Sequence, residues 1–277
     1  MKQIFLNLKR FDVLPKYGGV NRLTDASQWG SYIVEQTQNS LKKWVKQATF
    51  VDFFPEAHLI TAKLAQTQDS PVQLGCQGVY REDTAVKGNF GAFTTNRPAS
   101  AMVQLGCAWT IIGHCEERMD KAGLLEQAGV SEPRIVNQVL NQEVLAAQKA
   151  GLSVLYCIGE KEEEQVHWQD VLSAQLEQGL LGADRKKLTI AYEPIWSIGP
   201  GKVPADREYI SKVSKFLKSW DQEVPVVYGG GLKTSNASML ASIPEIDGGL
   251  IALTRFSGEV GFYPQEYFEI VKLYLEK

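Results

Sequence analysis

Histidine is scarce in this 277-residue sequence, and cysteine is sparse and scattered. The three histidines and four cysteines include no Cys-x-x-Cys or His-x-x-x-His spacing that would indicate a metal site. We therefore expect neither a metal nor a cofactor. Each cysteine lies in or beside an apolar run, which predicts buried, reduced thiols in a cytoplasmic protein. They are Cys76, Cys107, Cys115 and Cys157.

Long apolar runs and blocks of like charge are also lacking. No run reaches the roughly 18 residues that a membrane span needs, and the apolar stretch near Met1 is too short for a signal peptide. The net charge is −3, with basic and acidic residues interspersed, so no basic stripe indicates a nucleic-acid surface. The expected partner is a small molecule or a second copy of the chain.

The sequence does contain eight short apolar runs, each followed by a longer segment with helical periodicity. Most runs are continuously apolar, which is typical of parallel strands covered on both faces. Eight such repeats at this length predict a single (β/α)₈-barrel domain over residues 1–277, in the α/β class. The predicted strands are residues 4–6, 49–54, 72–76, 108–112, 153–158, 188–192, 225–228 and 249–253.

The sequence also contains start signals for helices and two long loops. Proline or aspartate precedes helical segments at 56–64, 134–149 and 207–220. The loops at 11–27 and 77–96 have a length that usually serves function or contacts a partner.

Polar residues directly follow three of the predicted strands. Asn7 and Lys9 follow the first strand, His114 and Glu116 follow the fourth, and Glu193 follows the sixth. Barrel enzymes carry their catalytic groups at these carboxyl ends. A carboxylate, an imidazole and a cation there could move a proton next to a carbonyl group. A lone histidine or lysine is more often structural or solvated, so only the three groups together indicate a site.

The segment after Glu193 is typical of a closing lid. Pro194 and Pro204 would stiffen its two shoulders around a tip that contains Gly199 and Gly201. Backbone N–H groups of the tip could bind an anion, although any turn of this kind needs glycine. The remaining histidines, 58 and 167, are interpreted as ordinary helix residues.

Together these motifs resemble the triosephosphate isomerase family over nearly the whole chain. The matching stretches are Asn-Leu-Lys at 7–9, Gly-Ala-Phe-Thr at 91–94, Ile-Gly-His-Cys-Glu-Glu-Arg at 112–118, Cys-Ile-Gly-Glu at 157–160, Ala-Tyr-Glu-Pro-Ile-Trp at 191–196, Tyr-Gly-Gly at 228–230 and Ile-Asp-Gly at 246–248.

The resemblance implies interconversion of glyceraldehyde 3-phosphate and dihydroxyacetone phosphate through an enediolate. Glu193 would abstract the proton, and His114 would polarise the carbonyl as a neutral imidazole. Lys9 would supply positive charge, with Asn7 binding the substrate oxygens. Glu116 would order Lys9 or His114.

The phosphate-binding residues depart from the family pattern. By resemblance, Gly199 would reach the phosphate when the lid closes. The family's serine after Tyr-Gly-Gly is Gly231 here, and its Gly-Gly turn after the eighth strand is Ala252 and Leu253. Side chains at that turn would narrow or move the phosphate pocket, because glycine allows close backbone approach. Arg255 is the nearest candidate replacement, unless it is an outward-facing surface charge.

The resemblance also implies a homodimer in which the loop after the third strand enters the neighbouring subunit. The family's glutamate and arginine pair in this region becomes Asn96 and Glu117 here, with Arg97 alongside. Either an inverted Arg97–Glu117 contact replaces that pair, or the dimer is built differently.

Two other functions stay open. The chain could be an isomerase or epimerase of a related sugar phosphate, such as a tetrulose phosphate. It could also be a non-catalytic barrel that binds a metabolite, since a fold alone does not fix a function.

Overall fold

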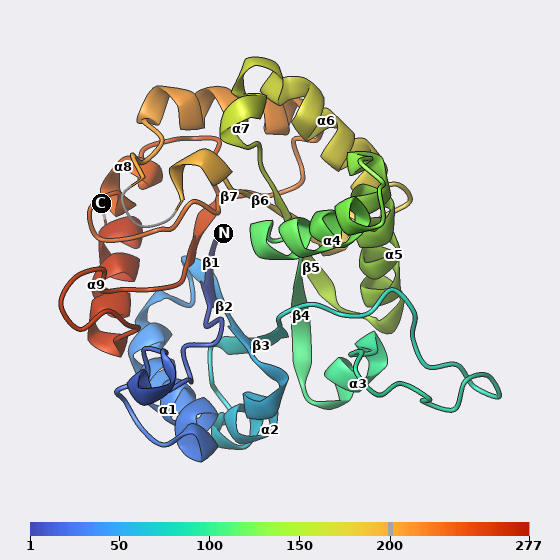
Figure 1. Cartoon of the computed structure of the whole chain (residues 1–277). Coiled ribbons are helices and arrows are strands. Elements are labelled where there is room, and N and C mark those ends of the chain that lie inside the picture. Colours follow the sequence, from blue (N-terminus) through green and yellow to red (C-terminus); the bar gives the residue numbers. More distant parts are fainter. Residues whose placement is uncertain (199–201, 277) are drawn as a thin grey trace.

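The computed structural model describes residues 1–198 and 202–276. Its centre is a closed barrel of parallel strands in chain order, in which β8 pairs with β1 (Figure 1). The predicted (β/α)₈ architecture is confirmed. The strands are β1 (Lys2–Asn7), β2 (Ala48–Phe54), β3 (Val72–Cys76), β4 (Cys107–Ile112), β5 (Ser153–Ile158), β6 (Leu188–Tyr192), β7 (Val226–Tyr228) and β8 (Gly248–Ile251).

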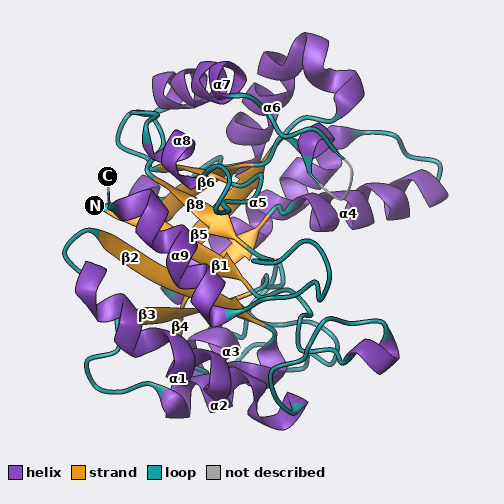
Figure 2. Cartoon of the chain, turned by 90° about the vertical axis from the view of Figure 1, so that its left-hand side faces the viewer, coloured by secondary structure: helices purple, strands orange, loops and turns teal. Residues whose placement is uncertain are grey.

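Helices surround the strands on the outside of the barrel, as Figure 2 shows. The segments predicted from capping signals are helical to within one residue at each end. The Asp206 carboxylate accepts a hydrogen bond from the Tyr209 N–H and so caps its helix. The helices are α1 (Trp29–Leu41), α2 (Glu56–Ala65), α3 (Ala99–Gln104), α4 (Cys115–Gln127), α5 (Pro133–Ala150), α6 (Trp168–Gly179), α7 (Arg207–Trp220), α8 (Ala237–Ala241) and α9 (Pro264–Leu275).

The core has two layers because successive strand side chains point to opposite faces. The larger layer lies between the strands and the helices. Burial on both faces explains why the strands read as continuous apolar runs. The smaller layer fills the barrel and consists of Phe5, Val51, Phe53, Ile111, Leu155, Cys157, Ala191, Val227 and Leu250.

The eighth strand is shorter than the sequence predicts, since β8 ends at Ile251 rather than at residue 253. Beyond Ile251 the chain turns back on itself, and the N–H groups of Thr254 and Arg255 both donate to the Gly261 carbonyl at 3.1 Å. Apolar character therefore continues past the point where the backbone leaves the barrel.

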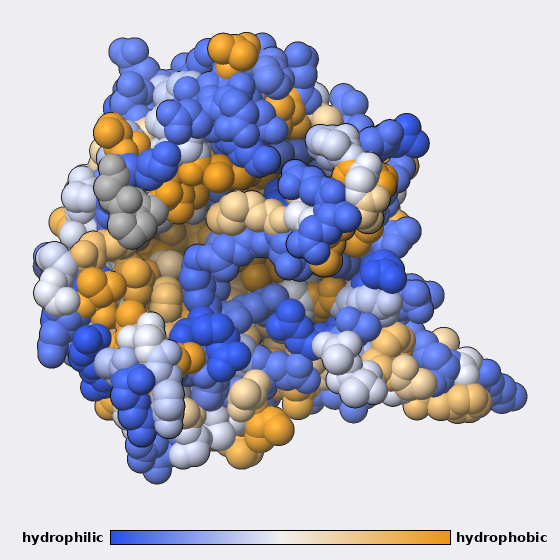
Figure 3. All heavy atoms as spheres, viewed as in Figure 1, coloured by the Kyte–Doolittle hydropathy of each residue, from blue (hydrophilic) through white to orange (hydrophobic). Residues whose placement is uncertain are grey.

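The long loop after β3 forms an arm that projects away from the barrel (Figure 1). Residues 77–98 contain no helix or strand. Near the tip, Val86 and Phe90 are 96% and 88% exposed. Apolar residues are visible on this arm in Figure 3.

The loop after β1 is anchored by a histidine for which the sequence predicted no role beyond that of an ordinary helix residue. His58 is buried on α2, and its Nε2 lies 3.0 Å from the Asp12 Oδ2. Asn21 closes the same loop by donating to the Asp12 carbonyl at 3.0 Å. His167 ends a short 3-10 turn before α6 rather than lying in an α-helix.

All four cysteines are free and buried, as predicted. Among the described residues, we find no helix that combines the length and the apolar character needed to cross a membrane.

Candidate active site

Glu193 lies at the carboxyl end of β6 and is 2% exposed. Its Oε1 lies 3.3 Å from the His114 Nε2, and its Oε2 accepts the Cys115 N–H at 3.0 Å. Burial raises the pKa of Glu193 above the usual carboxyl value, although the histidine and the N–H group oppose the shift. A carboxylate with a raised pKa is a stronger base than an ordinary one.

His114 connects β4 to α4 and caps the helix with its own ring. The His114 Nδ1 accepts the Glu116 N–H at 3.3 Å, so this nitrogen carries a lone pair. The neutral ring must then hold its proton on Nε2, which faces Glu193.

Lys9 follows β1 in a left-handed backbone conformation, with φ of 41°. The Asn7 side chain stabilises this turn by accepting the Lys9 N–H at 3.1 Å. The Lys9 Nζ lies 2.6 Å from the Glu116 Oε1. Burial disfavours the Glu116 charge, but Lys9 outweighs burial and lowers the pKa of this carboxyl. Glu116 therefore joins the Lys9 cation to the turn that holds His114.

Gln77, after β3, is a positioning group that the sequence analysis missed. Its Nε2 lies 3.3 Å from the Asn7 Oδ1 and 3.1 Å from the Lys9 carbonyl oxygen. It also donates to the Phe53 carbonyl at 3.2 Å. The signal in the sequence was only a polar residue after an apolar run, and many surface residues share it.

The shoulder of the predicted lid is tied to the barrel by Glu160, which is fully buried after β5. Its Oε1 accepts hydrogen bonds from the Tyr192 hydroxyl at 2.9 Å, the Trp196 Nε1 at 2.8 Å and the Tyr209 hydroxyl at 3.1 Å. These contacts hold Trp196, three residues after Glu193, in place. Gly199, the predicted phosphate contact, lies outside the described residues.

The residues that the sequence predicts to bind the substrate phosphate do not all face the same space. Gly231 has φ of 90°, which favours glycine, and open space surrounds the position of its missing Cβ. Ala252 and Leu253 are half-buried just beyond β8. The Arg255 guanidinium is instead turned to α9, where its Nη2 lies 2.5 Å from the Glu266 Oε1.

Lys233 offers another cation near the turn after β7. It lies two residues beyond Gly231, is half-buried, and places its Nζ 5.3 Å from the centre of the Phe256 ring. Within the described part of the chain, no carboxylate lies within ion-pair distance of Lys233. Nothing in the sequence distinguishes Lys233 from an ordinary loop lysine, so it was not predicted to bind an anion.

The inverted pair between Arg97 and Glu117 is not formed within the described chain. The Arg97 Nη2 donates to the Gln77 carbonyl at 3.2 Å, whereas Glu117 pairs with the Lys121 Nζ at 2.7 Å. Both residues line the same cavity, so an inverted Arg97–Glu117 contact in an assembled dimer stays a prediction.

Three possible donor atoms, from His114, Cys115 and Glu193, lie within 4.8 Å of one another. Burial and the Glu193 charge raise the pKa of Cys115 to about 12, so its thiol is protonated near neutral pH. The arrangement suits acid–base chemistry better than metal binding.

A parallel barrel with a buried carboxylate, an imidazole and an ammonium at its carboxyl-end mouth belongs to the class of barrel enzymes equipped for proton transfer. Comparison with known proteins narrows the class. The sequence model of the family described as "Triosephosphate isomerase" matches residues 25–260. This chain belongs to the triosephosphate isomerase family.

Relatives support this assignment along most of the chain. The triosephosphate isomerase of Acaryochloris marina is 32% identical over 204 residues, which cover 72% of this chain and 77% of the relative. That of Geobacter metallireducens is 33% identical over 210 residues, covering 71% and 76%. The crystal structure of the Bartonella henselae enzyme has a TM-score of 0.73 at 23% identity, covering 99% of this chain and 98% of that one, and shows the common fold.

Proposed function

We propose that this protein interconverts glyceraldehyde 3-phosphate and dihydroxyacetone phosphate by proton transfer through an enediolate. The observation that carries the proposal is the 3.3 Å contact between the Glu193 carboxylate and the His114 Nε2, with Lys9 linked to the same turn through Glu116. Base, electrophile and cation are then linked by contacts at one end of the barrel, which supports this chemistry.

In the proposed reaction, Glu193 removes a proton from the carbon beside the carbonyl. The His114 Nε2–H donates to the carbonyl oxygen and stabilises the enediolate. Lys9 offsets the negative charge, and Asn7 fixes both the Lys9 turn and the substrate oxygens. The hydroxyl proton passes between the two enediolate oxygens by way of the His114 ring, while Glu193 returns the carbon-bound proton to the neighbouring carbon, so both groups end as they began.

A coupled assay of purified protein with glyceraldehyde 3-phosphate tests this function. Turnover would support it, whereas activity only with a tetrulose phosphate would favour the second candidate. Ala252 and Leu253 are the specific observation behind that candidate, because their side chains occupy the turn where the family has glycines. Binding without turnover of either sugar would favour the non-catalytic barrel.

We propose that the phosphate lies near Gly231 and the turn at Ala252 and Leu253, with Gly199 completing the site. Lys233 offers the cation in this region, while Arg255 could join only by leaving Glu266. A guanidinium already paired with a carboxylate is a weaker anion ligand than an unpaired ammonium.

Replacing Ala252 and Leu253 together with glycine should tighten phosphate binding severalfold, because the backbone could then approach the anion. Calorimetric titration with 2-phosphoglycolate, which mimics the enediolate, measures the change. Lys233→Met serves as the companion variant and should weaken binding. Unchanged affinity in the double glycine variant would mean that the phosphate binds elsewhere.

We also propose that the protein is a cytoplasmic homodimer. Four buried, free thiols suit a reducing compartment. The exposed Val86 and Phe90 on the projecting arm suit burial against a second copy.

Phe90→Asp should convert the dimer to a monomer at micromolar concentration, because an unpaired carboxylate would have to be buried in the apolar interface. Light scattering after size exclusion gives the mass. Exposed Val166, which lies outside this arm, provides the control Val166→Asp. A dimer that survives Phe90→Asp at the wild-type dissociation constant would exclude the arm from the interface.

A further inference from the structure

The peptide before the candidate electrophile His114 is held from both sides. Gly113 has φ of 78°, and a Cβ there would lie 2.8 Å from the Cys157 carbonyl oxygen. The Gly113 N–H donates to the Glu117 Oε2 at 2.6 Å, and its carbonyl accepts from the Arg118 Nε at 2.8 Å. The buried N–H and carbonyl groups of Gly113 each need a hydrogen-bond partner, and only a correctly placed acceptor and donor supply them.

Glu117 completes a reciprocal cap at the start of α4. His114 is the N-cap, and its ring accepts the N–H of Glu116. Glu117, the third residue of the helix, reaches back to the N–H of Gly113. The arrangement resembles a capping box, except that Glu117 accepts the N–H of Gly113, the residue before the N-cap, rather than the N–H of the N-cap itself. The ring and the backbone of His114 are thus fixed by one turn.

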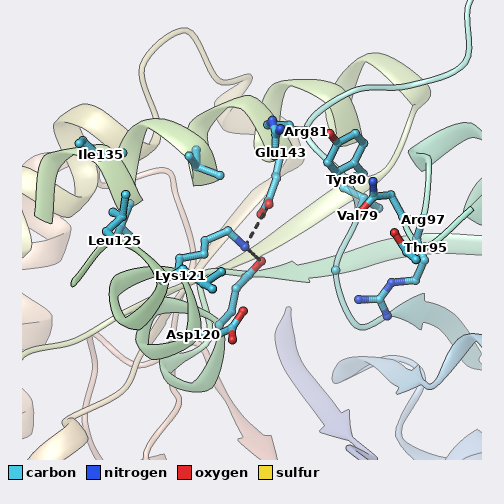
Figure 4. A pocket seen from close by; sticks show the side chains of 16 residues that line it. Val79, Tyr80, Arg81, Thr95, Arg97, Asp120, Lys121, Leu125, Ile135 and Glu143 are labelled. Atoms are coloured by element: carbon cyan, nitrogen blue, oxygen red, sulfur yellow. Dashed lines mark hydrogen bonds and ion pairs between the residues drawn. The ribbon is translucent and has the colours of Figure 1, made fainter. Parts of the chain in front are cut away.

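Glu117 is itself held by Lys121, which also pairs with a second carboxyl group. The Lys121 Nζ lies 2.7 Å from the Glu117 Oε1 and 3.1 Å from the Glu143 Oε1. Glu143, on α5, is buried. Figure 4 shows the Lys121 ammonium directed at the Glu143 carboxyl group.

The pKa values of the two carboxyl groups are shifted in opposite directions. Burial disfavours the Glu117 charge, but Lys121 and the Gly113 N–H outweigh burial and lower its pKa. Burial and the charge of Glu117 raise the pKa of Glu143 to about 8. Glu117 is therefore the ionised acceptor near neutral pH, and Glu143 is the neutral neighbour. A cavity of about 450 Å³ adjoins them, with Asp120 also on its wall.

We propose that Glu117 is a positioning residue for His114, which it aligns by accepting the Gly113 N–H while Lys121 holds the carboxylate in place. The inference rests on the proposed function. It concerns this chain in particular, because the family resemblance places an arginine at this position.

Three substitutions separate hydrogen bonding from charge. Glu117→Gln keeps an acceptor of the same length, and we expect its kcat within about threefold of wild type. Glu117→Asp keeps the charge but is one methylene shorter, and Glu117→Ala keeps neither. Both should lower kcat by roughly tenfold to a hundredfold at nearly unchanged KM, because small misplacements of catalytic groups cost this much. Glu126→Ala, on an exposed position of α4, is the control.

A readout independent of turnover distinguishes failure of this proposal from failure of the proposed function. Nitrogen-15 NMR of the His114 ring reports its tautomer, and we expect the Nε2–H form in wild type and Glu117→Gln but a mixture in Glu117→Asp. Folded Glu117→Ala with wild-type kcat and ring signals would overturn the proposal. So would an active aspartate variant beside an inactive glutamine variant. If the alanine variant does not fold, the comparison of glutamine with aspartate decides.

Discussion

Glu193→Gln should lower kcat for isomerisation by roughly 10³-fold, because an amide cannot accept the proton and general base catalysis contributes about this factor. The glutamine oxygen can still accept the Cys115 N–H, so the loss should not come from unfolding. Steady-state kinetics and circular dichroism measure both quantities. Glu163→Gln, on an exposed carboxylate, is the matched control and should behave as wild type.

The same carboxyl group governs the acid limb of the pH profile. Since burial raises the pKa of Glu193, the base loses its charge at a higher pH than an ordinary glutamate. Below that pKa, kcat/KM should fall tenfold per pH unit. An acid limb at the pKa of an exposed carboxyl group would argue against Glu193 as the base.

Asp52→Asn should stabilise the folded protein at alkaline pH by about 3 kcal/mol. Asp52 is fully buried on the outer face of β2, and both of its oxygens lack a hydrogen-bond partner among the described residues. Burial raises its pKa from 3.8 to about 8. The folded state therefore keeps a proton that the unfolded state releases.

The sign of the effect follows from that difference. Between pH 4 and pH 8 the unfolded chain binds fewer protons at Asp52, so the free energy of unfolding decreases as pH rises. Asparagine does not titrate and removes this decrease. Urea unfolding of both proteins at pH 5, 7 and 8 should give a difference that grows with pH. A difference independent of pH would mean that Asp52 has no raised pKa in the folded state.

Periodicity and capping predicted most of the barrel from the sequence. Short apolar runs, most of them continuous, located all eight strands, and Asp206 located the start of α7, because these signals are local. The end of β8 was misplaced at Leu253, since an apolar side chain can also face a mouth or a loop. Strand pairing, which decides the boundary, is a property of neighbours distant in the sequence.

The candidate site was predictable only where a residue directly follows a strand. Lys9, His114 and Glu193 were found because barrel topology brings all carboxyl ends to one mouth. The contacts of Gln77 and Glu117 could not be predicted from the sequence. Gln77 binds a side chain distant in the sequence and Glu117 binds a backbone N–H group, and neither contact produces a recognisable residue spacing. Arg255 was chosen for its chemistry, but Glu266 on α9 holds it.

Isomerisation of glyceraldehyde 3-phosphate in deuterium oxide tests the central claim most directly. A proton carried by Glu193 exchanges with solvent, so wild type should place deuterium on carbon 1 of dihydroxyacetone phosphate, and Glu193→Gln should form almost no product. Deuterium on a carbon other than carbon 1, or wild-type turnover in the glutamine variant, would contradict the account.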